Sequence, residues 1–113
     1  MAQFFSLYGR WYPGQKVTFN KHELSQILSI YGLRVQRGEW RDYALDSTYD
    51  TAMFSIFRSS NEKPAFVVAK TVPRNHKKQA KFSVSTENKT LIQSNSLMEA
   101  LTVFHEKDKE KKK

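Results

Sequence analysis

Residues 20–46, "NKHELSQILSIYGLRVQRGEWRDYALD", contain a change of hydrophobic period that decides the fold. In the first part of this stretch the apolar side chains recur at helical spacing, so that they form one stripe. This stripe consists of Leu24, Ile27, Leu28, Tyr31 and Val35. After Gly38 the period becomes two, which is the spacing of a strand. The stretch therefore predicts a helix whose stripe faces a core, followed directly by a strand.

The ends of this helix carry recognisable signals. Asn20 is a good N-cap, and Glu23 stands three residues later, where its side chain can complete a capping box. Gly38 accepts the left-handed conformation that closes many helices. Gly32 leaves a second interpretation open, because a glycine inside a helical pattern either ends the helix early or marks close packing. The predicted helix runs from Asn20 to about Gln36.

Four short runs with strand character follow Gly38, and a fifth is weaker. The four are "EWRDYALD", "TAMFSIFRS", "PAFVVAKTV" and "AKFSVSTE", which are rich in aromatic and β-branched residues. Their connections are too short for parallel crossovers, so we expect an antiparallel meander. "TLIQSNS", at 90–96, is a candidate for a fifth, short edge strand.

A second helix begins at Ser96, where "SLME" forms a capping box with Glu99. The sequence thus predicts an α+β fold: a helix, an antiparallel meander of about four strands and a C-terminal helix, with both helices on one face of the sheet. We divide the chain into an aromatic N-terminal extension at 1–16, a single α+β domain at 17–105 and a lysine-rich tail at 106–113. The extension either packs as an added strand or awaits a partner.

The composition limits the function classes. The chain of 113 residues has the length of one domain, and it has no cysteine for a disulfide, a thiolate nucleophile or a zinc-cysteine site. No apolar run approaches the roughly 20 residues that cross a bilayer, so we expect no membrane association. The first residues lack the pattern of a secretory signal, and we therefore predict a cytoplasmic protein.

Part of this sequence resembles a known family. "VTFNKHELSQILSIYGLRVQRGEWRDYALD" followed by "MFSIFR" is similar to short uncharacterised bacterial proteins, best known from alphaproteobacteria, in the domain-of-unknown-function family numbered 2794. The similarity is strong over 17–58 and looser from there to about 104. The similar positions are 17–19, Glu23, Leu24, Ile27, Leu28, Tyr31, Gly32, Val35, 38–46 and 54–58. The resemblance implies no activity, cofactor or substrate.

The net charge of +8 is concentrated in two segments. Residues 70–81 carry five cations and no acid, and the tail from His105 adds five lysines against three acids. A basic hairpin loop can lie along a phosphate backbone and release counterions. The five cations that we assign to nucleic-acid binding are Lys70, Arg74, Lys77, Lys78 and Lys81. The alternative is a solvated loop whose charge protects a sheet edge from aggregation.

The block "GEWRDY" offers a different kind of site. Trp40, Arg41, Asp42 and Tyr43 form either a structural anchor or a protein contact. In the first interpretation Trp40 covers the end of the helix, while Arg41 pairs with an acid at the entry of the strand. In the second, these residue types are the ones enriched in interface hot spots. The sequence leaves open which side chains point inward.

Carboxylates are the remaining candidates for chemistry. Glu39, Asp42, Asp46 and Asp50 lie close in sequence, but Asp42 and Asp46 would stand about 13 Å apart on a regular strand. This separation is too large for two oxygens to share a metal directly, so only a bend would create an ion site. The constellations of a nucleophile, a base or a phosphate loop are missing. We predict a protein that is not an enzyme and has no catalytic residue, metal or cofactor.

Two function hypotheses follow. The preferred one is a nucleic-acid-associated protein that contacts DNA or RNA non-specifically through its basic loop. The alternative is a protein-interaction or self-associating module, which would use the aromatic N-terminus and the "GEWRDY" surface to bind a partner or form a homodimer.

Overall fold

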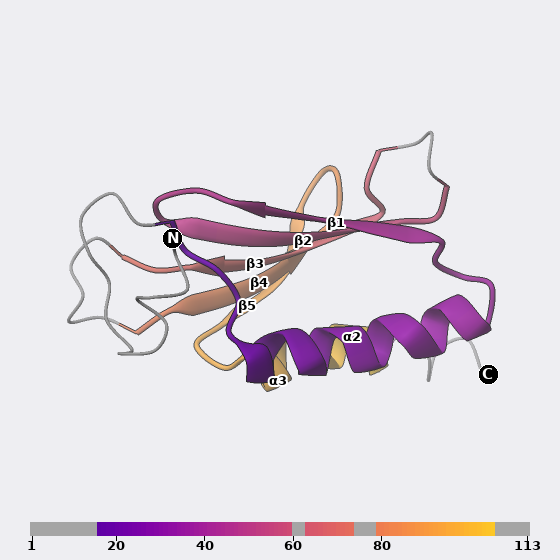
Figure 1. Ribbon diagram of the computed structural model, residues 1–113, viewed down its shortest axis with the longest axis horizontal. Helices are drawn as coiled ribbons and strands as arrows, with labels where there is room; N and C mark the ends of the chain where they lie inside the picture. Colours follow the sequence, from indigo (N-terminus) through magenta and orange to yellow (C-terminus); the bar gives the residue numbers. More distant parts are fainter. Residues whose placement is uncertain (1–15, 60–62, 74–78, 106–113) are drawn as a thin grey trace.

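The computed structural model describes residues 16–59, 63–73 and 79–105. In this part of the chain a long helix comes first, a sheet follows, and a short helix comes last (Figure 1). The elements are α2 (Lys21–Gln36), β1 (Asp42–Ser47), β2 (Thr51–Phe57), β3 (Phe66–Thr71), β4 (Lys81–Ser85), β5 (Thr90–Ser94) and α3 (Leu97–Ala100). The aromatic extension, except for its last residue Lys16, and the tail at 106–113 lie outside the described residues.

The sheet is an antiparallel meander with the strand order β1-β2-β3-β4-β5. This confirms the predicted α+β fold, although the strands number five because Thr90–Ser94 pairs with β4. The register between β4 and β5 shifts between Val84 and Ser85. The two edges of the sheet are β1 and β5, the first and the last strand in the chain.

Both helices cover the same face of the sheet, as predicted (Figure 1). On that face the central strands present alternate side chains that are fully buried, as a half-buried sheet requires. α3 packs against β4 and β5. The buried cluster consists of Ile27, Trp40, Phe54, Ile56, Phe66, Val68, Phe82, Val84, Leu97, Ala100, Leu101 and Phe104.

The predicted helix signals are confirmed at both ends of α2. The Asn20 side chain accepts the Glu23 N–H at 2.7 Å, and Glu23 Oε1 accepts the Asn20 N–H at 2.8 Å. Gly38 has a φ of 76°, and its N–H donates to the Val35 carbonyl beyond the last helical turn. Gly32 lies inside an uninterrupted helix, so the earlier end is excluded. At the start of α3 the Ser96 cap is confirmed, since its side chain accepts the Glu99 N–H. The predicted capping box is incomplete, because the Ser96 N–H donates to Ser94 Oγ and Glu99 Oε1 accepts the Ser94 hydroxyl.

The predicted inner stripe of α2 is partly wrong. Ile27 is buried, but Leu28 is 36% exposed and Val35 39% exposed. Arg34, which is only 4% exposed, occupies the inner side instead. Spacing of apolar residues cannot anticipate this rotation, because it depends on a charged side chain that finds partners elsewhere in the fold. No helix in the described part of the chain has the length and apolar character to cross a membrane.

Candidate functional site

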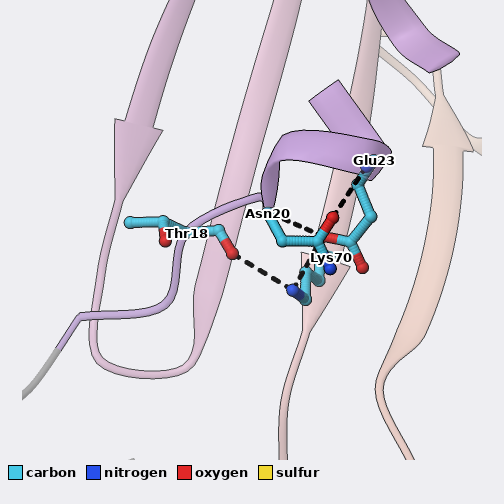
Figure 2. A network of polar contacts seen from close by, with 4 residues as sticks. All are labelled: Thr18, Asn20, Glu23 and Lys70. Atoms are coloured by element: carbon cyan, nitrogen blue, oxygen red, sulfur yellow. Dashed lines mark hydrogen bonds and ion pairs between the residues drawn. The ribbon is translucent and has the colours of Figure 1, made fainter. Parts of the chain in front are cut away.

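Lys70, the first of the five predicted phosphate-binding cations, lies inside the protein. It belongs to β3, and its side chain points from the sheet toward the start of α2 (Figure 2). Its Nζ lies 2.8 Å from Glu23 Oε1 and donates to the Thr18 carbonyl at 3.1 Å. Because Lys70 is buried and paired, it is not exposed to a phosphate group, which corrects its assignment to the basic surface.

This contact joins two functions in one carboxylate. Glu23 Oε1 closes the capping box on Asn20 and also receives the ammonium group of Lys70 (Figure 2). A buried charge is costly unless it is paired and hydrogen-bonded, and here both partners meet that condition. The result is a fixed link between the first turn of α2 and the middle of the sheet.

The other four predicted cations are placed differently. Lys81 opens β4 and is exposed. Arg74, Lys77 and Lys78 lie in the segment 74–78, outside the described residues. Lys81 is therefore the member of the predicted set whose described position suits a polyanionic partner.

The "GEWRDY" block is divided between the core and the surface. Trp40 is buried and meets Phe104 edge-on, with 5.1 Å between the ring centroids. Arg41 and Asp42 are exposed. The Arg41 N–H donates to the Phe57 carbonyl, and Asp42 Oδ1 accepts the Tyr43 N–H. Trp40 thus acts as the inward anchor, and the residues after it reach the surface.

The arginine that anchors this junction is Arg34, and not Arg41 as predicted. Its Nη1 lies 2.8 Å from Glu39 Oε1, and its Nη2 donates to the Phe104 carbonyl at 2.6 Å. The guanidinium also lies over the Trp40 ring, at 5.2 Å from the centroid. Arg34 is seven residues after Ile27 and so lies on the same side of the helix, but this spacing does not identify its partners.

These two polar anchors determine which side of α2 faces the core. Glu23 holds the first turn and Arg34 holds the last, so the helix cannot turn to bury its complete apolar stripe. Tyr31 lies at the margin of the buried side, and its ring meets Tyr43 of β1 edge-on at 5.0 Å. With 3.6 residues per turn, Leu28 and Val35 lie beyond Tyr31 on this flank of the helix. The flank therefore lies toward the outer side of β1.

β1 continues the same apolar surface. Tyr43 is 41% exposed and Leu45 50% exposed, although both alternate toward the helix-covered face of the sheet. The Tyr43 ring stacks on Phe54, with 4.7 Å between the ring centroids. A shallow depression on the surface of α2 is lined by Lys21, Leu24, Ser25, Leu28 and Ser29. We name this surface the α2–β1 face, and it consists of Leu24, Leu28, Val35, Tyr43 and Leu45.

No described strand pairs with the outer edge of β1, and directly after the strand the Val17 N–H donates to the Thr48 carbonyl at 2.8 Å. At the turn after the strand, the Thr48 N–H donates to the Thr51 carbonyl at 2.8 Å. In an antiparallel ladder the direction of the backbone groups alternates, so those of Tyr43, Leu45 and Ser47 point away from β2. Exposed apolar side chains and the outward backbone groups of β1 thus lie side by side, and of these groups the Tyr43 N–H already donates to Asp42 Oδ1.

The four candidate carboxylates do not gather into an ion site. Asp42 and Asp46 pair with Phe57 and Met53 and so alternate to the sheet face opposite the helices. Glu39 binds Arg34, and Asp50 Oδ1 accepts the hydroxyl groups of Thr48 and Thr51 in the turn. In the described residues, no three histidine or carboxylate side chains are close enough to hold a metal together.

The electrostatics of the α2–β1 face affect one tyrosine. Burial raises the pKa of the Tyr31 phenol above its ordinary value, and the nearby charges of Asp42 and Tyr43 raise it further. Tyr31 therefore remains a neutral aromatic residue at physiological pH. The α2–β1 face is consequently apolar, and Asp42 and Asp46 of β1 lie on the opposite face of the sheet.

The fold is that of a small α+β protein whose two helices cover one face of a five-stranded antiparallel sheet. The chain belongs to the family described as Protein of unknown function (DUF2794), whose model matches residues 17–101. The match covers α2, all five strands and the start of the C-terminal helical segment. No curated protein matches the sequence. No solved structure matches the fold.

Proposed function

We propose that this protein is a protein-interaction module that binds its partner through the α2–β1 face. The observation that carries the proposal is the exposure of Leu28, Val35, Tyr43 and Leu45 on adjoining elements, beside a strand edge that no other described strand covers. The role involves no chemical step. The protein contact that the sequence predicts for the "GEWRDY" block would then lie on β1 and the flank of α2. Trp40 would not take part, because it belongs to the core.

Two physical arguments support this role. Contiguous apolar surface rimmed by polar residues is typical of interaction sites on small proteins, whereas single exposed apolar residues are ordinary. An open strand edge also accepts a further strand, because its N–H and C=O groups are already arranged for pairing. The α2–β1 face supplies backbone pairing and apolar burial together.

Site-specific photocrosslinking in the producing cell tests the proposal. A benzophenone amino acid replaces Leu45 on β1, and in a matched control it replaces Gln93, an exposed residue of β5 at the opposite edge of the sheet. We expect protein adducts from position 45 and none from position 93. Absence of adducts at position 45, or equal labelling at both positions, would contradict the proposed role.

Nucleic-acid association is the second candidate, and the exposure of Lys81 in a chain of charge +8 supports it. Replacement of Lys77, Lys78 and Lys81 by glutamine tests it without disturbing the buried Lys70. Fluorescence anisotropy with a short duplex and a single strand should show binding at low salt that the replacement abolishes and that salt weakens. Failure of the unaltered protein to bind at low salt would remove this candidate.

The two candidates use different surfaces. Asp42 and Asp46 lie on β1, and their charges repel a phosphate backbone from this edge. A polyanion would therefore bind near Lys81 and leave the α2–β1 face to a protein.

A further inference from the structure

We propose that the partner at the α2–β1 face is a second copy of this chain, joined by antiparallel pairing of the two β1 strands with Leu45 on the two-fold axis. The inference rests on the proposed function and names its partner. In the resulting dimer, the two sheets continue into one another and the two α2 helices lie on the same face.

The backbone of β1 is suited to pairing with itself. Its outward groups belong to Tyr43, Leu45 and Ser47, which are spaced two residues apart as one side of an antiparallel ladder requires. When a second β1 strand is placed antiparallel, Leu45 meets Leu45 of the second copy, and Tyr43 meets the second copy's Ser47. The Tyr43 N–H then exchanges its bond to Asp42 Oδ1 for a bond to a main-chain carbonyl.

Charge selects this register over its neighbour. Asp42 and Asp46 lie on the sheet face opposite the helices. The residues that they face in the second copy depend on which residue of β1 lies on the two-fold axis. With Leu45 at the centre, Asp46 stands opposite Ala44 of the second copy, and Asp42 stands opposite Thr48. With Ala44 at the centre, Asp42 would stand directly opposite Asp46, and like charges in such a pair are destabilising.

The flank of α2 supplies the remaining contact area. A standard interface buries about 800 Å² per partner, which is more than the edge of a short strand provides. Because α2 covers the sheet beside β1, a two-fold axis through Leu45 turns the exposed Leu28 and Val35 of each copy toward those of the other. Apolar side chains that the isolated chain leaves exposed are then removed from water.

Salt distinguishes this partner from a nucleic acid. Each chain carries a net charge of +8, so two copies repel each other, and added salt screens that repulsion. Self-association through the α2–β1 face should therefore strengthen with salt. Binding to a phosphate backbone weakens with salt, because counterions are released on binding.

Disulfide cross-linking tests the register. The chain has no cysteine, so Leu45→Cys introduces a single thiol at the two-fold axis, and Gln93→Cys introduces one at the opposite edge. Hydrogen-bonded residues across an antiparallel pair have Cα atoms about 5.5 Å apart, within the range of a disulfide. We expect mild oxidation to give a covalent dimer from Leu45→Cys and a monomer from Gln93→Cys.

Sedimentation of the cysteine-free protein over a dilution series provides the second measurement. We expect a dimer that dissociates on dilution, and Leu45→Asn should weaken it by about tenfold or more. Monomers at every concentration, or equal cross-linking of both cysteine variants, would overturn the second copy as partner. If photocrosslinking at position 45 then yields adducts with a different protein, the proposed function stands and only this inference fails. If it yields none, both fail.

Discussion

The two ends of the sheet are completed in different ways. Next to β4 and β5, α3 buries Leu97, Ala100 and Leu101 against the sheet. Next to β1, α2 is held by polar anchors at its two ends and leaves Leu28 and Val35 exposed. One helix is thus oriented by its apolar residues and the other by its ion pairs. On α2 the exposed Leu28 and Val35 adjoin the exposed side chains of β1, whereas α3 exposes Met98.

Truncation of one aromatic residue in each region gives the largest expected difference. Phe104→Ala should lower the free energy of unfolding by about 3–5 kcal/mol, because it empties a buried site between Trp40 and Phe66. Tyr43→Ala on the open edge should cost about 1 kcal/mol, because its ring is half exposed and loses mainly its contacts with Tyr31 and Phe54. Urea unfolding followed by circular dichroism measures both. Equal costs would show that the edge is as well packed as the core.

The Arg34 anchor should have the next largest effect. Arg34→Ala removes the ion pair with Glu39, the bond to the Phe104 carbonyl and the packing on Trp40, with an expected loss of about 3 kcal/mol. Arg34→Met keeps most of the packing and should cost less. Urea unfolding measures the free energy of unfolding of both variants. If Arg34→Ala leaves this free energy unchanged, the contacts of Arg34 do not orient α2.

At the other end of the helix, Glu23→Ala should cost about 2 kcal/mol, because it opens the capping box and leaves the Lys70 ammonium without its carboxylate. Asn20→Ala is the matched control, since it removes the cap but keeps the ion pair, and it should cost about 1 kcal/mol. Thermal unfolding separates the two. If the two substitutions cost the same, the contact between Glu23 and Lys70 adds nothing to the cap.

The smallest expected effect is the alkaline pH dependence from Tyr31. Its pKa is raised in the folded protein, so the folded state retains the phenol proton at a pH where the unfolded chain has lost it. This contribution is complete below the ordinary pKa of about 10 and is lost as the pH rises through the folded value. The free energy of unfolding should fall over that pH range, and it should fall less in the Tyr31→Phe variant. Identical alkaline profiles for both proteins would contradict the assignment.

The sequence predicted the fold better than the site, for a physical reason. Caps, helical spacing and strand spacing are local signals, and Asn20, Glu23, Gly38 and Ser96 acted as expected. The placement of Lys70 and of Arg34 depends on partners that are distant in the sequence, namely Glu23 and the Phe104 carbonyl. A charged residue has no local signal that separates a buried pair from an exposed cation.

Residue-resolved hydrogen exchange at two protein concentrations tests association through the α2–β1 face in the unaltered chain, because it monitors the edge of β1. We predict that concentration slows exchange of the outward Leu45 and Ser47 amides while the amides at the edge of β5 keep their rates. Exchange at Leu45 and Ser47 that is independent of concentration, or equal slowing at both edges, would contradict association through the α2–β1 face.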